Sequence, residues 1–165
     1  MISTGSGRRP RAPTASSTSR STMSRCAHHP QHAGPHGFAR TLIAIAKRTG
    51  VVGYPGDGAN RWPAGHTLDA GHLYRLALED APAGTRWHAV GDEGIPMRQI
   101  AQSIGDHLGM SAASIPADRL EGHFGFLAML IALDNPTSSL ATRRILGWEP
   151  AHPGLLADFA GGDYF

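Results

Sequence analysis

The stretch GDGANRWPAGHTLDAGHLYRLALE, residues 56–79, decides the fold, because turn chemistry gives way to helical periodicity within it. Its first half, up to Pro63, is rich in Gly, Asp, Asn and Pro, which favour turns. In its second half apolar residues recur at helical spacing, which predicts a helix over residues 70–79 with Asp69 as its N-cap. The face expected to pack inward carries Ala70, Leu73, Tyr74 and Ala77.

The preceding stretch GVVGYPG, residues 50–56, has the glycine spacing of a dinucleotide-binding fingerprint. Such glycines must follow a strand and open a helix, so that the pyrophosphate meets free N–H groups. Here FARTLIAIAKRTG, residues 38–50, precedes them with helical periodicity and ends in Gly50, which fits a left-handed cap. A turn, and no helix, follows. We therefore expect no cofactor cradle in this stretch.

The rest of the chain alternates short strand patterns with amphipathic helices. Strands are predicted for VVGY (51–54), TRWHAV (85–90) and SAASIP (111–116), and GDEGIP (91–96) is interpreted as a loop. Helices are predicted over residues 37–49, 70–79, 96–108, 117–133, 135–146 and 153–159. About five to six helices with short strands indicate an α/β or α+β class.

Charge divides the chain into two parts. Residues 1–50 hold eight of the 15 Lys and Arg residues and none of the 13 acidic residues. Residues 1–34, rich in Ser, Arg and Pro, are predicted to form a disordered basic tail. The alternatives are a nucleic-acid arm, a targeting peptide, or a misassigned start or altered reading frame. Residues 35–165 are predicted to form one globular domain, whose acidic balance does not support nucleic-acid binding by that domain.

Composition also bears on location and association. No apolar run reaches the roughly 18 residues of a membrane span, so no membrane contact is expected. The single cysteine, Cys26, excludes an internal disulfide framework and favours the cytoplasm. The apolar run FGFLAMLIAL, residues 124–133, is more than a small domain covers, so self-association is expected.

Ten histidines raise the question of a metal site. The densest group matches no compact zinc spacing, and only adventitious binding is expected of its members: Cys26, His28, His29, His32 and His36. The others are scattered, and each is expected to be solvated or hydrogen-bonded: His66, His72, His88, His107, His123 and His152. The sequence therefore predicts no metal site, and without a G-x-S-x-G elbow it offers no catalytic serine either.

Four residues of the opening stretch are candidates for ligand binding: Asn60, Arg61, Trp62 and His66. A loop with these groups can hold an anionic or hydroxylated ligand through Arg61 and stack it on Trp62. The alternative is a turn in which Trp62 plugs the core and Arg61 pairs with Asp57. Both interpretations stay open at the level of the sequence.

Three blocks in succession carry a resemblance to a known family. They are GDGANRWPAGHTLDAGHLYRLALE, TRWHAVGDEGIPMRQIAQSIGDHLG and LGWEP, and together they resemble the C-terminal part of extended short-chain dehydrogenases/reductases, the NAD-dependent epimerase/dehydratase family. The likeness covers residues 35–165. It implies a substrate-binding domain that packs on an N-terminal Rossmann domain, with Asn60, Arg61, Trp62 and His66 on the substrate side and Asp69 as a helix cap.

The chain departs from the family at the catalytic pair. Family members carry Tyr-x-x-x-Lys, in which the Tyr moves a proton and the Lys lowers its pKa and holds the cofactor ribose. The single lysine here is Lys47, and Ile43 stands where that tyrosine is needed. The resemblance implies NAD(P), yet we expect this chain alone not to bind it.

Two function classes follow from this comparison. The first is the substrate-binding portion of an NAD(P)-dependent epimerase, dehydratase or reductase, acting on a sugar nucleotide or another small hydroxy or carbonyl substrate. Its Rossmann half would then be lost or encoded separately. The second is a non-catalytic binding or interaction module that retains the same fold.

Overall fold

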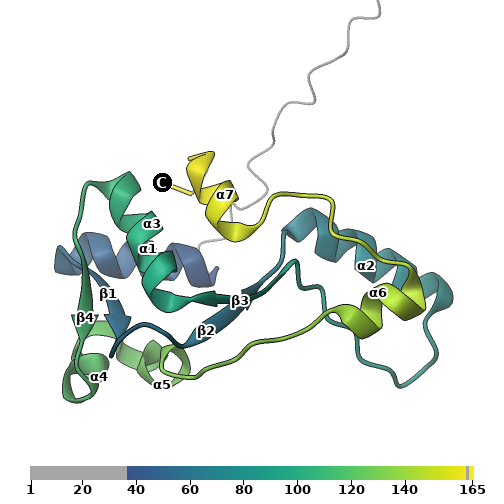
Figure 1. Ribbon diagram of the computed structural model, residues 1–165, viewed down its shortest axis with the longest axis horizontal. Helices are drawn as coiled ribbons and strands as arrows, with labels where there is room; N and C mark the ends of the chain where they lie inside the picture. The colour runs from purple at the N-terminus through teal and green to yellow at the C-terminus, as the bar shows by residue number, and fades with distance from the viewer. Residues whose placement is uncertain (1–36, 163) are drawn as a thin grey trace, which may run out of the picture.

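The computed structural model describes residues 37–162 and 164–165 (Figure 1). The predictions for the tail at 1–34 and for the histidine group that begins at Cys26 lie outside these residues. The elements, in chain order, are α1 Phe38–Thr49, β1 Val52–Pro55, β2 Arg61–Ala64, α2 Thr67–Asp80, β3 Asp92–Pro96, α3 Met97–Leu108, β4 Ala112–Ile115, the 3₁₀ turn Ala117–Arg119, α4 Leu120–Phe124, the 3₁₀ turn Gly125–Leu127, α5 Ala128–Ile131, α6 Leu140–Leu146 and α7 Leu155–Ala160. Short strands mixed with helices confirm the predicted α/β class.

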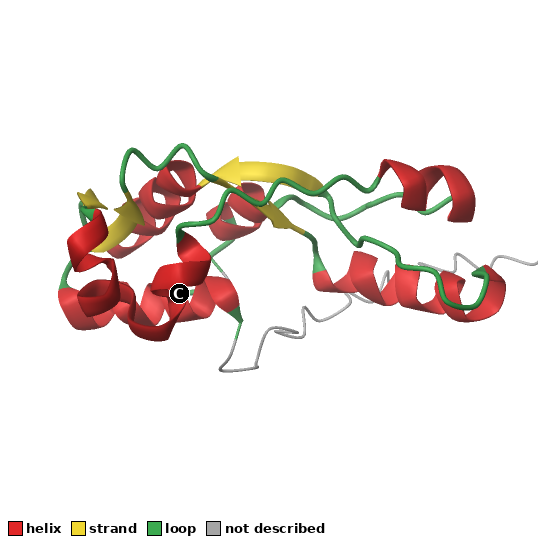
Figure 2. Ribbon diagram, turned by 90° about the horizontal axis from the view of Figure 1, so that it is seen from below, coloured by secondary structure: helices red, strands yellow, loops and turns green. Residues whose placement is uncertain are grey.

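The strands form two small sheets. Strands β1 and β4 are parallel, with Val52 opposite Ala112, whereas β2 and β3 are antiparallel, with Arg61 opposite Pro96. The β2–β3 ribbon runs from the end of the molecule that holds most helices toward the end that holds α2 and α6 (Figures 1 and 2). The ribbon thereby connects the two ends of the molecule, each of which has its own buried residues.

The main core lies where α1 and α3 meet the β1–β4 sheet. Helix α1 ends as predicted at Gly50, which has a φ of 74° and donates its N–H to Ala46 O. The left-handed conformation suits glycine because it has no Cβ. Apolar residues of α3 are buried, and with residues of α1, β1, β3, α4, the turn Gly125–Leu127, α5 and α7 they form one cluster: Leu42, Ile43, Ile45, Ala46, Val52, Ile95, Met97, Ile100, Ala101, Ile104, Phe124, Leu127, Ile131 and Phe159.

The opposite end has its own small set of buried residues. Helices α2 and α6 lie side by side there (Figures 1 and 2). Leu73 of α2 and Trp148, just after α6, are both buried. The Trp148 ring donates its Nε1–H to Asp69 O at 3.0 Å, which ties the segment after α6 to the first turn of α2. The predicted burial of Leu73 is confirmed, whereas Tyr74 from the same predicted face is exposed.

The strand predicted at 85–90 and the loop predicted at 91–96 are both wrong. Residues 85–90 are irregular, and there the His88 N–H bonds to the side chain of Thr142 at 3.0 Å. Residues 92–96 form β3, which pairs with β2. Strand identity here depends on which segment lies alongside, and local composition does not encode that.

Three predicted helix boundaries also change. Helix α2 begins at Thr67 with His66 as N-cap, so the prediction that Asp69 caps it is wrong. The single helix predicted over 117–133 is interrupted at Gly125, whose φ is 57°. Helix α6 starts at Leu140, because the residues before it bond to the β2–β3 ribbon: Asn135 N to Arg61 O and Thr137 N to Glu93 O, both at 2.8 Å.

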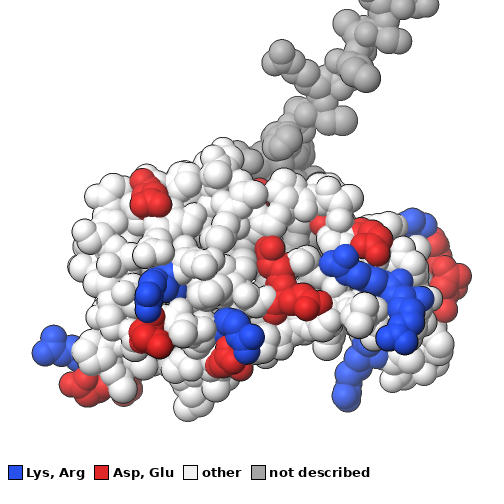
Figure 3. Space-filling view, in the orientation of Figure 1, with Lys and Arg blue, Asp and Glu red and all other residues white. Residues whose placement is uncertain are grey.

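Helix α2, at 14 residues, is the longest helix of the described part of the chain. Within that part, no helix has both the length and the apolar character that a membrane crossing requires. On the face shown in Figure 3, Lys and Arg side chains gather over the end that holds α2 and α6, whereas the charges over the other end lie in separate patches. The two ends therefore differ in surface character as well as in packing.

Candidate functional site

Asn60, directly before β2, is held by the end of α5 and the segment that follows it. Its side-chain nitrogen donates to Ile131 O at 2.7 Å and to Leu133 O at 3.1 Å. An amide group has two N–H donors, and both are used in these bonds. Asn60 therefore anchors residues 131–133 to the start of the strand.

Arg61 is paired with Asp134 of the same segment. Its Nε donates to Oδ1 at 3.0 Å and its Nη2 to Oδ2 at 2.8 Å, while its backbone N–H reaches Oδ1 at 2.7 Å. Hydrogen bonds from the Arg61 side chain and backbone lower the pKa of Asp134 to about 2. Both side chains are about half exposed, at 48% and 49%. The alternative of an Arg61–Asp57 pair is wrong, because Arg61 pairs with Asp134; the Asp57 carboxylate accepts the Ala59 N–H at 2.9 Å.

Trp62 packs against the main core and is partly buried. Its ring is stacked on Phe38 with 4.8 Å between centroids and 15° between planes. Offset aromatic stacks of this kind contribute about 0.5–1.5 kcal/mol beyond the area they bury. One face of the ring that was considered as a stacking platform for a ligand is thus covered by α1.

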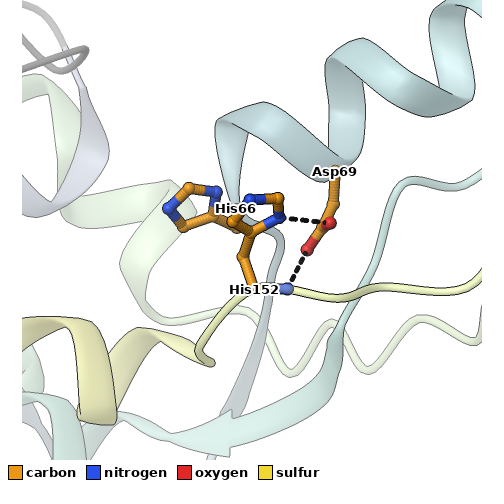
Figure 4. Close-up of side chains that lie close together, drawn as sticks. All are labelled: His66, Asp69 and His152. Atoms are coloured by element: carbon orange, nitrogen blue, oxygen red, sulfur yellow. Dashed lines mark hydrogen bonds and ion pairs between the residues drawn. The ribbon is translucent and has the colours of Figure 1, made fainter. Parts of the chain in front are cut away.

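His66 lies where β2 passes into α2, and it contacts residues far along the chain. Its Nδ1 accepts the Leu68 N–H at 3.2 Å, which caps the helix. Its ring is stacked on that of His152, with 4.5 Å between centroids and 9° between planes. Figure 4 shows the two rings beside the carboxylate of Asp69.

Asp69 is a buried carboxylate with three hydrogen-bond donors around it. Oδ1 accepts from Ala151 N at 3.0 Å and from His152 Nδ1 at 2.6 Å, and Oδ2 accepts from His152 N at 3.1 Å (Figure 4). Burial disfavours the charge, but the hydrogen bonds from Ala151 and His152 together outweigh it and lower the pKa of Asp69. The carboxylate is therefore ionised at neutral pH, and it fixes the segment at 151–152 against α2.

A small pocket of about 90 Å³ opens beside this cluster. It is lined by Gly65, His66, Asp69, Gly91, Asp92, Pro150, His152, Pro153 and Gly154. Asp92 accepts the Leu155 N–H at 2.8 Å through Oδ2 and so holds the first residue of α7. A Cβ at Gly154 would lie 2.6 Å from Asp92 Oδ1, so glycine is the residue that fits at this position of the pocket.

The four sequence-predicted residues thus point to different neighbours. Asn60 and Arg61 contact residues 131–134, Trp62 contacts α1, and His66 stacks on His152 near Asp69. Sequence reasoning missed His152 and Asp134, because each reaches its partner from more than 70 residues away. Neither lies in a motif or in a periodic face. For Asp69, the sequence indicates only a helix cap.

Sequence comparison with known proteins gives two close curated relatives. An uncharacterized protein of Schizosaccharomyces pombe is 47% identical over 133 residues, and an uncharacterized protein of Saccharomyces cerevisiae is 47% identical over 125 residues. The matches cover 81% and 76% of this chain but 45% and 42% of the relatives. The chain therefore spans less than half the length of these proteins. No family model matches the chain.

Comparison of structures finds sugar-nucleotide dehydratases. DesIV, a dTDP-glucose 4,6-dehydratase from Streptomyces venezuelae with NAD and TYD bound, has a TM-score of 0.58 at 24% identity, covering 79% of this chain and 38% of that one. The dTDP-glucose 4,6-dehydratase of Bacillus anthracis in complex with NAD has a TM-score of 0.54 at 15% identity, covering 76% and 39%. Over the part that it shares with them, the chain has the mixed α/β fold of these dehydratases.

Proposed function

We propose that the chain is the substrate-binding portion of an NAD(P)-dependent epimerase, dehydratase or reductase that acts on a sugar nucleotide or another small hydroxy or carbonyl substrate. The observation that carries this proposal is the fold likeness to dTDP-glucose 4,6-dehydratases, at a TM-score of 0.58 over 79% of the chain. The shared part is 38% of the enzyme's length. The cofactor and the catalytic pair would come from a Rossmann half outside this sequence, and the assembled protein would work in the cytoplasm.

Arg61 is the residue best placed to recognise the phosphates of such a substrate. Its guanidinium is half exposed, and Asp134 already holds it in a bidentate arrangement. A phosphate can take the same two-pronged geometry, because guanidinium forks match both carboxylate and phosphate oxygens. In this proposal, a substrate phosphate takes the place of Asp134 on Arg61, while Asn60 and Trp62 fix the strand that carries Arg61. His66, which follows β2, lines the small pocket beside Asp69 and His152.

Substitutions on either side of this ion pair test the role of Arg61. We expect Arg61→Gln to weaken dTDP-glucose binding by about tenfold or more, because a charge-assisted hydrogen-bond pair is lost. Asp134→Asn leaves the guanidinium charged and removes its competitor, so binding should stay equal or become tighter. Isothermal titration of the full chain, with circular dichroism to verify folding, gives both values.

Uncharged ligands complete this test. Glucose and thymidine should bind equally weakly to wild type and to both variants, since neither carries a phosphate. Equal dTDP-glucose affinity for wild type and Arg61→Gln would contradict the assignment of Arg61. Absence of any binding by folded wild type would contradict the substrate role itself, and would favour the binding-module alternative.

The same proposal predicts that this chain alone does not bind NADH tightly. The described residues around GVVGYPG form a helix, a strand and a turn, with the helix ahead of the glycines as expected from the sequence. Titration with NADH, followed by energy transfer from Trp62, Trp87 and Trp148, measures the affinity. A dissociation constant at or below about 1 μM corresponds to about −8 kcal/mol and would contradict the prediction.

A further inference from the structure

We propose that His66, Asp69 and His152 form a binding site for a divalent transition-metal ion of the Zn²⁺ class, a role separate from the substrate portion proposed above. One ligand-type atom from each of the three residues lies within 4.8 Å of the other two. The three come from the start of α2 and from the segment before α7 (Figure 4). Two imidazoles and a carboxylate, with water in the fourth position, are a common ligand set for zinc.

Asp69 supplies the charge that such a site needs. Its carboxylate is buried, and it accepts three hydrogen bonds from Ala151 and His152. Each carboxylate oxygen can accept about two hydrogen bonds. The described bonds use both positions on Oδ1 but one on Oδ2, so Oδ2 retains a position for a cation.

His152 lies close enough to Asp69 for the two residues to share an ion. Its Nδ1 lies 2.6 Å from Asp69 Oδ1, and the proton of the neutral ring fills this contact. A cation would replace that proton: the ring proton moves to Nε2, and Nδ1 turns its lone pair to the ion beside the Asp69 carboxylate. The two ligand atoms then need to separate only from 2.6 Å to the roughly 3.3 Å of a tetrahedral site.

His66 must exchange one interaction for another. Its Nδ1 accepts the Leu68 N–H, and a neutral imidazole has one lone pair. Metal binding by the ring and capping of α2 by the same ring therefore compete. The rings must also tilt out of their stack, because ligand atoms around a tetrahedral zinc are about 3.3 Å apart and here reach 4.8 Å. Both steps predict a site of moderate affinity.

The pocket next to the cluster favours a cation. Its lining includes two carboxylates, Asp69 and Asp92, and no Lys or Arg among the described residues that line it. Arg75 of α2 and Arg143 of α6 are not part of this lining, and they pair with Glu79 and Glu149. The pocket's glycines leave space for water molecules that would complete the coordination.

Zinc titration of the untagged full chain tests the proposal. We expect Zn²⁺ to raise the midpoint of thermal unfolding, because it binds the folded site. His66→Asn keeps an efficient N-cap and removes the ligand; His152→Gln keeps a donor toward Asp69. Each should weaken zinc binding by about tenfold or more and reduce the shift in the midpoint.

His72→Asn is the matched control, since His72 is exposed on the same helix and outside the cluster. It should bind zinc as wild type does. If wild type, His66→Asn and His152→Gln show the same zinc affinity and the same midpoint shift, the bound zinc is adventitious and the proposal is overturned. Co²⁺ absorbance provides a second measurement: loss of its visible four-coordinate bands in folded His66→Asn supports the site, and unchanged bands overturn it.

Discussion

Replacing Asp69 with alanine is expected to reduce the free energy of unfolding by about 3 kcal/mol, because three donors lose their acceptor inside the fold. Those donors are the backbone N–H groups of Ala151 and His152 and the ring of His152. The Asp69 side chain is 5% exposed, so water replaces the lost bonds only in part. The substitution should therefore release the segment at 150–154 from α2.

The contribution of Asp69 also depends on pH in a defined direction. Its pKa in the folded protein is below the value of 3.8 expected for the unfolded chain. The stabilisation is therefore complete above about pH 4 and is lost as the pH falls through the lower folded value. The contribution of Asp134, whose pKa is about 2, is also lost as the pH falls. Wild type should lose stability below pH 4, and Asp69→Asn should flatten part of that slope.

Urea denaturation at pH 7 and at pH 3 separates these effects. At pH 7, Asp69→Asn should lie between wild type and Asp69→Ala, since an amide oxygen still accepts a hydrogen bond. Asp80→Ala is the control at the exposed C-terminal end of the same helix, and it should change stability by less than about 0.5 kcal/mol. Equal stability of Asp69→Ala and Asp80→Ala would contradict the role given to the buried carboxylate.

The helices of the main core could be predicted because their signals are local. In α1 and α3 the apolar residues recur every three to four positions, and Gly50 and Gly109 end the two helices in left-handed conformations. The β2–β3 ribbon carries no such signal. RWPA contains a proline and DEGIP contains acids and a glycine, so these segments become strands only because they lie beside each other.

For each contact of the candidate site, the sequence indicates only one of the two residues that meet. Arg61 and His66 stand in a stretch whose composition attracts attention, whereas Asp134 and His152 follow no period or spacing rule. Asp69 illustrates the difficulty. An aspartate near a helix start is normally interpreted as a cap, and here the histidine three residues earlier takes that position while the aspartate binds a segment 82–83 residues away.

The second large effect is expected on self-association, through the exposed apolar face formed by Phe126, Met129, Leu130 and Leu133. Phe126 is 83% exposed and Met129 is 81% exposed. Their neighbours Phe124, Leu127 and Ile131 are buried in the main core, and they anchor the segment that carries the exposed face. The prediction from the sequence that this run exceeds what the domain covers is confirmed for these residues. Contiguous apolar surface of this kind favours association.

We therefore expect the chain to self-associate. We also expect Phe126→Ser with Met129→Glu to weaken that association by about tenfold or more, while the free energy of unfolding changes by less than about 0.5 kcal/mol.

Leu73→Ala is the contrasting variant. Leu73 is buried beside α6, so its truncation should cost about 2–5 kcal/mol and leave association of the folded fraction unchanged. Sedimentation velocity at several concentrations, combined with urea denaturation, measures the two properties separately. Because the altered side chains lie outside the core and Leu73 lies at the opposite end of the molecule, the two effects should be independent. A monomer at all concentrations, with no binding of a hydrophobic dye, would contradict the prediction and would favour a module that functions without a partner on this face.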